Sequence, residues 1–544
     1  YPGGSSIDLH NAFTRSKKIR VILPRHEQGG GFMAHGYARS TGKVGVCMAT
    51  SGPGAMNLLT TISDAFMDSI PMVAITGQVF QSLIGKSAFQ ETDVFGMTLP
   101  VVKHSYLVLN AEDLPRIIKE AFLIAKSGRP GPVVIDIPKD VQQKVFVPDF
   151  DAKPDLPGVK PVSAASDADI SKIISMISAS KKPVIYAGGG IISSSSSKKL
   201  DEFSKLFGIP VATTLMGIGC VDPMEKKNLY WFGMHGTYVG NRAVLESDLL
   251  IALGTRFDDR ITGVVSKFAP NAKIIHLDID ISEQNKNVKV DLSVCSEVGT
   301  ALDKLLAASK KLPKKPDFSE WVGQISQWKK VHPYPFGRHN RKNITSQEAI
   351  AELYKVSKGD VIVTTGVGQH QMWAAQHLKI QFARQWLTSG GLGTMGFGLP
   401  AALGAQLARP QSRVISISGD GGFKMTGSEL FTIASNNVPV IAIVFNNSGL
   451  GMIRQLQTVQ FAKRFTACEL PGYVDFVKYA AAFGIEGEHA DTPEALAQAV
   501  AKAWECRKPY LIEVCINPKN MVLPMVAPGL GINDFVKFAD DEIN

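Results

Sequence analysis

The chain has 544 residues, of which 45% are hydrophobic and 20% are charged, the composition of an ordinary folded globular protein. At roughly 150–200 residues per domain, this length predicts about three domains. The 58 basic and 49 acidic residues give a net charge of +9. Because these charges are spread along the chain, they disfavour a nucleic-acid-binding stripe and leave small anionic ligands as plausible partners. No apolar run approaches the roughly 20 residues of a membrane span.

The cysteines indicate the redox environment. Six cysteines, at positions 47, 220, 295, 468, 506 and 515, are scattered and form no Cys-x-x-Cys pair. This distribution predicts reduced thiols in a soluble protein of a non-oxidising compartment. The sequence begins without methionine, so we expect it to be trimmed and any targeting peptide to be missing, which leaves cytoplasm, plastid and mitochondrion open.

Two stretches divide the chain into three segments. Residues 147–162, rich in Pro and Asp, and about 310–340, rich in Lys and Pro, predict linkers. Each segment between them alternates strand-like apolar runs with helical stretches, which is the pattern of parallel α/β domains. We therefore predict an α/β protein with three doubly wound parallel-sheet domains, at residues 1–150, 163–310 and 340–544.

The first and last segments resemble each other. Val44 to Gly54 and Val414 to Gly422 are strand-like runs that end in glycines and precede a helix. A second apolar run follows each helix, starting near Ile70 in the first segment and Val438 in the last. This repetition indicates a duplicated fold.

The first segment also contains an acidic residue in a distinctive context, Leu23-Pro-Arg-His-Glu27-Gln-Gly-Gly. In isolation, Glu27 beside Arg25 and His26 would be read as a solvated surface charge.

The middle segment carries weak nucleotide-binding signals. Pro183 to Gly190 is a strand that enters a glycine turn, which is not specific by itself. Asp278 or Asp280 at the end of a strand could accept hydrogen bonds from ribose hydroxyls. Arg256 and Arg260 could bind a diphosphate, although a surface ion pair between Arg260 and Asp259 is the alternative.

The last segment holds the most informative pattern, Gly419-Asp420-Gly421 followed by Asn446-Asn447. Asp420 follows a strand-like run, and open α/β sheets place ligands at the carboxyl ends of strands. The run from Val438 to Phe445 would bring the asparagines to the same edge, 27 positions after Asp420 (447 − 420). A carboxylate, an amide oxygen and phosphate oxygens suit Mg²⁺. A Gly-Asp-Gly turn alone is more often only a turn, but this combination predicts a metal and diphosphate site.

Together these motifs resemble those of thiamine-diphosphate enzymes, and the Glu27 motif resembles the one that carries the catalytic glutamate of acetohydroxyacid synthases, also called acetolactate synthases. The resemblance extends along nearly the whole chain. Further matching motifs, in the same order as in the family, are Tyr1-Pro-Gly-Gly4, Thr50-Ser-Gly-Pro-Gly-Ala55, Ile75-Thr-Gly-Gln-Val79, Ala88-Phe-Gln-Glu-Thr92, Gly128-Arg-Pro-Gly-Pro132, Gly254-Thr-Arg-Phe-Asp-Asp-Arg260 and the run from Ser389 to Pro400.

The resemblance implies an acetolactate synthase of branched-chain amino acid biosynthesis. Such an enzyme decarboxylates pyruvate on thiamine diphosphate and condenses the hydroxyethyl carbanion with a second 2-keto acid, pyruvate or 2-ketobutyrate. Thiamine diphosphate, Mg²⁺ and FAD are the implied cofactors, the FAD having no net redox role. The first domain would bind the pyrimidine, the central domain FAD, and the last domain the diphosphate and Mg²⁺. A homodimer or tetramer with active sites between subunits is expected; a regulatory small subunit stays open, and neither nucleic acid nor membrane is an expected partner.

The resemblance also assigns residues. Glu27 would hydrogen-bond N1′ of the pyrimidine, where a carboxyl group works best with a pKa raised by burial, while Met395 would support the bent cofactor and the backbone of Gly393 and Met395 would pair with the pyrimidine edge. Gln90, Phe89 and Lys139 match active-site positions. The predicted metal ligands are Asp420, Asn447 and the backbone carbonyl of Gly449. The other predicted cofactor-binding residues are Gly419, Gly421, Gly422, Asn447 at the diphosphate, and Arg129, Gly188, Gly189, Met234, His235, Gly236, Thr237, Gly254, Arg256, Asp258, Arg260, Asp278 and Asp280 at the FAD.

Several positions depart from the common family pattern. Leu456 stands where most of these synthases carry Trp, Phe80 replaces a usual Pro, and Pro528 occupies a position that is often Ser or Ala. With Met452, these residues lie in segments that line the substrate channel and the herbicide site in the family. The cofactor motifs are therefore intact while the channel is altered.

Alternative functions are weaker. Pyruvate oxidase is a related enzyme with both organic cofactors, but its flavin accepts electrons. Glyoxylate carboligase lacks the glutamate present here as Glu27, and a non-catalytic protein on this scaffold would be expected to lose Glu27 or Asp420. The catabolic acetolactate synthases lack FAD and the Arg-Phe-Asp-Asp-Arg pattern, which favours the biosynthetic branch.

Overall fold

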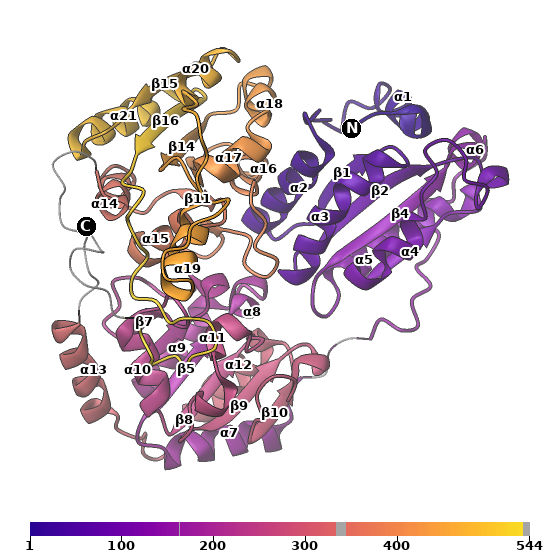
Figure 1. Ribbon diagram of the computed structural model, residues 1–544. Helices are drawn as coiled ribbons and strands as arrows, with labels where there is room; N and C mark the ends of the chain where they lie inside the picture. The colour runs from indigo at the N-terminus through magenta and orange to yellow at the C-terminus, as the bar shows by residue number, and fades with distance from the viewer. Residues whose placement is uncertain (161, 163, 333–343, 537–544) are drawn as a thin grey trace.

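The computed structural model describes residues 1–160, 162, 164–332 and 344–536. It contains three parallel β-sheets, which follow one another along the chain, with helices packed on them (Figure 1). The predicted fold of three doubly wound parallel-sheet domains is therefore confirmed. Among the described residues, no helix has both the length and the apolar character required to cross a bilayer.

The N-terminal domain has a four-stranded sheet in the order β1-β2-β4-β3, with all pairs parallel. Successive residues of β2 face opposite sides, so that Val73 and Ala74 belong to separate buried clusters. The helices and strands are α1 (Ile7–Phe13), α2 (Glu27–Thr41), β1 (Gly45–Ala49), α3 (Pro53–Met67), β2 (Met72–Gln78), α4 (Val94–Thr98), β3 (His104–Leu107), α5 (Leu114–Lys126), β4 (Pro132–Pro138) and α6 (Lys139–Gln143).

The central domain has a six-stranded parallel sheet in the order β10-β9-β8-β5-β6-β7. Its elements are α7 (Asp167–Ala179), β5 (Pro183–Ala187), α8 (Gly189–Ser193), α9 (Ser197–Phe207), β6 (Val211–Thr213), β7 (Asn228–Trp231), α10 (Tyr238–Glu246), β8 (Leu249–Leu253), α11 (Asp259–Thr262), β9 (Lys273–Asp278), β10 (Leu292–Cys295), α12 (Val298–Ser309) and α13 (Ser319–Val331).

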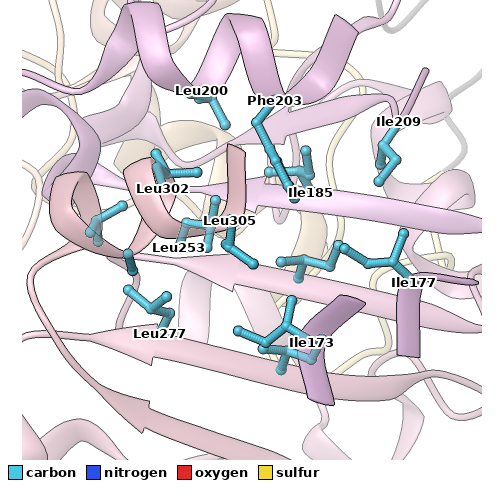
Figure 2. Close-up of a cluster of buried hydrophobic side chains, with 14 of the residues drawn as sticks. Ile173, Ile177, Ile185, Leu200, Phe203, Ile209, Leu253, Leu277, Leu302 and Leu305 are labelled. Carbon is cyan, nitrogen blue, oxygen red and sulfur yellow. The ribbon is translucent and has the colours of Figure 1, made fainter. Parts of the chain in front are cut away.

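The core of this central domain shows why its strands are apolar on both faces. Ile185 of β5 points toward the cluster in Figure 2, where it meets Phe203 of α9 and Leu305 of α12. Its neighbour Tyr186 packs on the other face, with Phe232 at 4.8 Å between ring centroids. Helices therefore cover both faces, as expected for strands that are almost continuously hydrophobic.

The C-terminal domain has a second six-stranded parallel sheet, in the order β12-β11-β13-β14-β16-β15. Its elements are α14 (Ser346–Ser357), β11 (Ile362–Thr365), α15 (Gln369–His377), β12 (Trp386–Leu387), α16 (Gly398–Ala408), β13 (Val414–Gly419), α17 (Asp420–Thr426), α18 (Glu429–Ser435), β14 (Val440–Asn446), α19 (Gly451–Gln460), α20 (Phe476–Ala481), β15 (Glu486–His489), α21 (Pro493–Cys506) and β16 (Tyr510–Cys515).

The predicted duplication is confirmed by the order of the strands. The order β1-β2-β4-β3 in the first sheet recurs as β13-β14-β16-β15 in the last. The two runs that resemble each other in sequence form β1 and β13, and the apolar runs after them form β2 and β14. The outer domains share a four-stranded core, which the C-terminal domain extends with β11 and β12.

The first predicted linker contains no helix or strand in its described residues, but the second requires a correction. Helix α13 lies inside the segment 310–340, where Trp321 is buried and its Nε1 donates a hydrogen bond to the carbonyl of Pro183 at 3.2 Å. Burial of Trp321 and Ile325 against the central domain fixes this helix. The part of the linker at 333–343 lies outside the described residues.

One buried carboxyl group of the N-terminal domain gives a testable pH dependence. Asp136 in β4 accepts hydrogen bonds from Thr76 Oγ1 at 2.7 Å and Gln78 Nε2 at 2.9 Å, and burial raises its pKa from 3.8 to about 7. The folded chain therefore holds this proton more tightly than the unfolded chain does, so the stabilising contribution is complete below about pH 4 and is lost as the pH rises through about 7. Asp136→Asn should make the thermal unfolding midpoint fall less between these pH values than in the native protein. Identical pH dependence in the two proteins would contradict this assignment.

Candidate active site

The carboxyl edge of the C-terminal sheet brings the predicted metal ligands together. Asp420 is the first residue of α17, directly after β13, and Asn446 ends the neighbouring strand β14. The register pairs Gly419 with Phe445, so Asp420 is level with Asn446, and Asn447 follows one residue later. Asn447 Oδ1 accepts a hydrogen bond from the backbone of Gly449 at 3.1 Å, which bends this segment into a turn.

Asp420 is in an environment that suits a metal ligand. The residue is 1% exposed, and its Oδ2 has no hydrogen-bond partner among the described residues. Burial raises the pKa of the Asp420 carboxyl from 3.8 to about 6, although Lys424 acts in the opposite direction. A buried carboxylate oxygen without a partner is costly, and a cation would satisfy it. With the oxygens of Asn447 and Gly449, this donor set fits Mg²⁺.

The loop that carries Met395 lies against this edge. Gly393 and Gly396 have φ values of +71° and +87°, a left-handed backbone that favours glycine. Thr426 Oγ1 donates to the carbonyl of Gly396 at 2.8 Å, and a Cβ placed on Gly421 would lie 3.7 Å from Met395 Cε. The structure therefore brings Met395 and the Gly-Asp-Gly turn together, with Gly422 also beside Met395.

A third segment at this edge was missed by the sequence analysis. β11 ends at Thr365, and the following Gly366-Val-Gly368 turn starts α15 with Gln369 and His370. His370 is buried against Gly419, and burial lowers its pKa to about 4, so the ring is neutral. The strand that ends in Gly-Val-Gly was the available signal, because it reaches the same edge as Asp420.

Both outer domains position the segment that contains Glu27. It is the first residue of α2 and half-buried, and Asn57 Nδ2 donates to its Oε2 at 3.0 Å. Glu429 of α18 accepts the backbone N–H groups of Arg25 at 3.0 Å and His26 at 3.1 Å. Glu27 therefore differs from a solvated surface charge, since the C-terminal domain fixes the turn before it.

The space beside Glu27 is a mainly apolar cavity of about 660 Å³. Met33 and Leu58 of the N-terminal domain line it together with Leu407 of α16. Because the cavity is mainly apolar, it offers the Glu27 carboxyl group few hydrogen-bond partners that would compete with a ligand.

The other predicted catalytic residues follow strand ends of the N-terminal sheet. Lys139 starts α6 after β4, and Phe80 follows β2; a hydrogen bond from the Gln81 amide to Asp140 at 3.1 Å joins the two segments. Gln90 has a φ of +60° and its backbone lies against Gly52. Phe89 is 89% exposed in the single chain, so a partner is required if it is to enclose a substrate.

A cavity of about 380 Å³ lies between the domains, at the carboxyl edge of the central sheet. The need for glycine at Gly188 is steric, because a Cβ there would overlap the carbonyl oxygen of Gly254. Burial raises the pKa of Asp278 to about 6, and Arg256 supplies a positive charge. The predicted cofactor-binding residues on its wall are Arg129, Gly189, Gly254, Arg256, Asp258 and Asp278.

Other residues predicted for the same cofactor lie elsewhere. Asp280 pairs with Arg129 Nη1 at 3.1 Å, and Arg260 is largely exposed, 3.8 Å from Asp259. The carbonyl of Met234 accepts a hydrogen bond from Val526 at 2.8 Å. The carbonyl of His235 accepts one from Gln376 at 2.9 Å, Gly236 packs on Phe232, and Thr237 caps α10. Within one chain, the segment 234–237 thus contacts the C-terminal domain instead of the cavity wall.

The cavity wall also includes residues that the sequence analysis missed. Thr214 and Met216 follow β6, Glu297 precedes α12, and Asp68 and Ser69 end α3. The end of β6 at the carboxyl edge could have identified the first two, whereas the α3 residues come from a different domain.

Three of the four predicted channel residues lie on two segments of the C-terminal region, whereas Phe80 follows β2 of the N-terminal domain. Met452 and Leu456 are four positions apart on α19, so they share one face of the helix. Pro528 is exposed in the segment after β16, which runs to the central domain and pairs Gly531 with Gly263 (Figure 1). Gln455 ties α19 to this segment, donating to the carbonyl of Val522 at 3.0 Å.

Three family models match the three domains in order. They are the N-terminal TPP binding domain of thiamine pyrophosphate enzymes at residues 1–97, the central domain at 170–305 and the C-terminal TPP binding domain at 366–514. The chain is 46% identical to acetolactate synthase 1, chloroplastic, of Nicotiana tabacum, over 99% of this chain and 82% of the relative. It is 45% identical to acetolactate synthase, chloroplastic, of Arabidopsis thaliana, over 100% of this chain and 82% of the relative. It is 44% identical to acetolactate synthase of Mycobacterium bovis, over 99% of this chain and 88% of the relative. The chain therefore belongs to the acetolactate synthase family of thiamine-pyrophosphate-dependent enzymes.

Proposed function

We propose that this chain performs the acetolactate synthase reaction at the carboxyl edge of the C-terminal sheet, with Glu27 as its proton-exchanging carboxyl group. Membership of the family makes the chain a thiamine-diphosphate-dependent carboligase that acts on 2-keto acids. The observation that carries the location is the buried Asp420 carboxylate with an unsatisfied oxygen, placed beside the Met395 loop. A metal ligand and a loop that supports the cofactor are the two parts that a bent, metal-bound diphosphate cofactor requires.

The roles of the residues follow from their chemistry. Asp420, Asn447 and the Gly449 carbonyl would hold Mg²⁺, and the N-terminus of α15 with His370 would face the diphosphate. When bound, thiamine diphosphate supplies the nucleophilic carbon that adds to the keto acid and the electron sink for loss of carbon dioxide. Glu27 would exchange a proton with N1′ of the pyrimidine, and Met395 would support the same ring.

We propose that FAD binds in the cavity at the carboxyl edge of the central sheet. The close approach of Gly188 to Gly254 leaves a side-chain-free wall for a bulky ligand, and Arg256 offers a charge for its diphosphate. Asp278 at the end of β9 would accept hydrogen bonds from the ribose hydroxyls. We propose that Arg129, already oriented by Asp280 and by Glu283 at 2.7 Å, contributes to the same cavity.

A homodimer would complete the catalytic site. The walls of the cavity beside Glu27 do not include Met395 or Asp420 among the described residues of one chain. Phe89 is left exposed, and a second copy could cover it while bringing a C-terminal edge to Glu27. Gln90 and Lys139 belong to the same domain as Glu27. They would therefore line the keto acid site that this domain forms with the C-terminal edge of the second copy.

Domain boundaries and compartment complete the proposal. We propose domains at residues 1–150, 163–310 and 340–544, with α13 packed on the central domain. The six cysteines are free, which supports a reducing compartment. Because the tobacco and Arabidopsis relatives are named as chloroplastic, a plastid is one such compartment.

The direct test supplies the purified chain with pyruvate, thiamine diphosphate, Mg²⁺ and FAD and identifies the products. Acetolactate and carbon dioxide are expected. Anaerobic bleaching of bound flavin by pyruvate, with acetate as the product and without acetolactate, would favour the pyruvate oxidase alternative. Omission of each cofactor in turn shows which of the three the reaction requires.

Leu456 should influence the choice of the second keto acid. An indole at this position would pack against the longer side chain of 2-ketobutyrate and offer a flat face to aromatic inhibitors, and an aromatic contact is worth about 0.5–1.5 kcal/mol beyond buried area. Leu456→Trp should therefore raise the preference for 2-ketobutyrate over pyruvate, and the affinity for sulfonylurea-type inhibitors, by several-fold. A competition assay with both keto acids and an inhibitor titration measure this.

Phe80 should reinforce the effect of Leu456 by changing the channel wall, so Phe80→Pro is tested beside it. Tyr354→Trp on α14, away from the channel, is the control for a new indole. If Leu456→Trp changes neither preference nor inhibition, position 456 does not line the channel.

A further inference from the structure

A buried polar network joins α3 of the N-terminal domain to the Ser389–Thr394 loop of the C-terminal domain. Asp64 is 0% exposed, and its Oδ2 accepts hydrogen bonds from the hydroxyls of Ser389 at 2.5 Å and Thr394 at 2.6 Å. One helical turn later, Asp68 accepts the backbone amides of Gly390 at 3.0 Å and Gly391 at 2.6 Å. Two carboxylates on one face of α3 thus receive four donors from six consecutive loop positions.

The charges of this network explain why the loop has little freedom. The guanidinium of Arg39 pairs with Asp68, and its Nε donates to His35 Nε2 at 3.1 Å. Burial lowers the pKa of His35 well below 6.5, so this ring is neutral where its Nδ1 faces Asp64 at 3.5 Å. Among the described residues, Arg39 is then the cation that pairs with these two buried carboxylates, and buried charge without partners is strongly unfavourable. The hydroxyls and amides of the loop must therefore supply the hydrogen bonds that the two carboxylates still need.

The Ser389–Thr394 loop contains Gly393 and leads directly into Met395, the two residues expected to contact the pyrimidine. Thr394, held by Asp64, lies between Gly393 and Met395, and its amide also donates to Ser389 Oγ at 2.8 Å. Gly393 has a left-handed backbone, so the loop needs external contacts to keep this shape. Asp68 lines the cavity at the carboxyl edge of the central sheet, whereas Asp64 does not. The two carboxylates can therefore be tested separately.

We propose that Asp64 and Asp68 are positioning residues for the reaction: they hold the Ser389–Thr394 loop in the shape that presents Gly393 and Met395 to the thiamine pyrimidine. This inference rests on the proposed function, because it requires that the cofactor binds at this loop. The N-terminal domain then has a second role within its own chain, shaping the cofactor site on the C-terminal domain.

The test compares Asp64→Ala with Asp64→Asn in the full-length chain saturated with FAD and Mg²⁺. Isothermal titration calorimetry gives the dissociation constant of thiamine diphosphate, and steady-state kinetics give kcat at saturating cofactor. Asp64→Ala should raise the dissociation constant by about tenfold or more, because two hydrogen bonds to a charged acceptor are lost, while kcat recovers to within about threefold. Asp64→Asn keeps an acceptor oxygen and should fall between Asp64→Ala and the native chain.

The matched control is Asp136→Asn, a buried aspartate of the same domain whose partners, Thr76 and Gln78, belong to that domain. It should leave the cofactor dissociation constant unchanged. Asp68→Asn should weaken the binding of both thiamine diphosphate and FAD, since Asp68 also lines the central cavity.

Thr394→Val tests the contact from the other side and serves if Asp64→Ala does not fold. The combined Asp64→Ala and Thr394→Val variant should lose less cofactor affinity than the sum of the single changes, as coupled partners do. If both single variants bind thiamine diphosphate normally while Met395→Ala binds it weakly, the positioning role is wrong and the proposed function stands. If Met395→Ala and Asp420→Ala also bind it normally, the cofactor site itself is wrong, and this inference fails with it.

Discussion

Replacement of Glu27 by Gln is expected to lower kcat by roughly 10²–10⁴-fold, the range for loss of a general acid–base group. The amide preserves the size of the side chain and can still accept the hydrogen bond that Asn57 now gives to Glu27 Oε2 at 3.0 Å. It cannot exchange a proton with N1′ of the pyrimidine. Affinity for thiamine diphosphate should therefore largely survive while turnover is lost.

The measurement is steady-state turnover of pyruvate at saturating thiamine diphosphate, with cofactor binding measured in parallel. Glu112→Gln is a suitable control, since Glu112 belongs to the same domain and forms an exposed pair with Lys144 at 2.9 Å. It should keep native turnover. Near-native turnover in Glu27→Gln would show that Glu27 takes no part in the proton exchange. A loss of cofactor affinity as large as the loss of turnover would instead show that Glu27 has a structural role.

The backbone before Glu27 is fixed by the C-terminal domain. Glu429 is 1% exposed and accepts the amides of Arg25 and His26, just as Asp64 receives donors from the C-terminal loop. Each outer domain thus uses a buried carboxylate to fix a short segment of the other. Such contacts limit the positional freedom of both segments, and catalysis is sensitive to displacements of about 1 Å.

The parts of this site that could be predicted from sequence are local ones. The turn at Asp420 and the pair Asn446-Asn447 are separated by two short helices and one strand, so periodicity and glycine placement are sufficient to put them on one edge. The duplicated fold was equally visible, because β1 and β13 begin similar strand–turn–helix units.

The long-range contacts could not be predicted, since spacing carries no information about them. Asp64 and Ser389 are 325 positions apart, and buried aspartates and exposed ones look alike in sequence. The segment 234–237 was assigned to FAD by resemblance, but its backbone is used to bind the segment around Val526. Helix α13 was hidden because Lys and Pro on both sides gave the region the composition of a linker.

Asp420→Ala should separate cofactor binding from stability. The affinity for Mg²⁺ and thiamine diphosphate should fall by at least about 10–100-fold, the loss that changes in residues surrounding a metal site already produce. Stability without cofactor should not fall, and we expect a higher unfolding midpoint, because the variant lacks a 1% exposed carboxylate whose Oδ2 has no partner among the described residues. Function and stability trade against each other at such sites.

Thermal unfolding with and without Mg²⁺ and thiamine diphosphate measures both effects in one experiment. The native protein should gain stability from the cofactors by mass action, whereas Asp420→Ala should gain little, and excess Mg²⁺ should restore only part of the activity. Asp360→Ala is the control, because Asp360 is exposed and precedes β11 at the opposite edge of the same sheet. A lower midpoint without cofactor, together with an unchanged cofactor dissociation constant, would identify the Gly-Asp-Gly turn as structural only, since a carboxylate that binds no cation is retained only if it supports the fold.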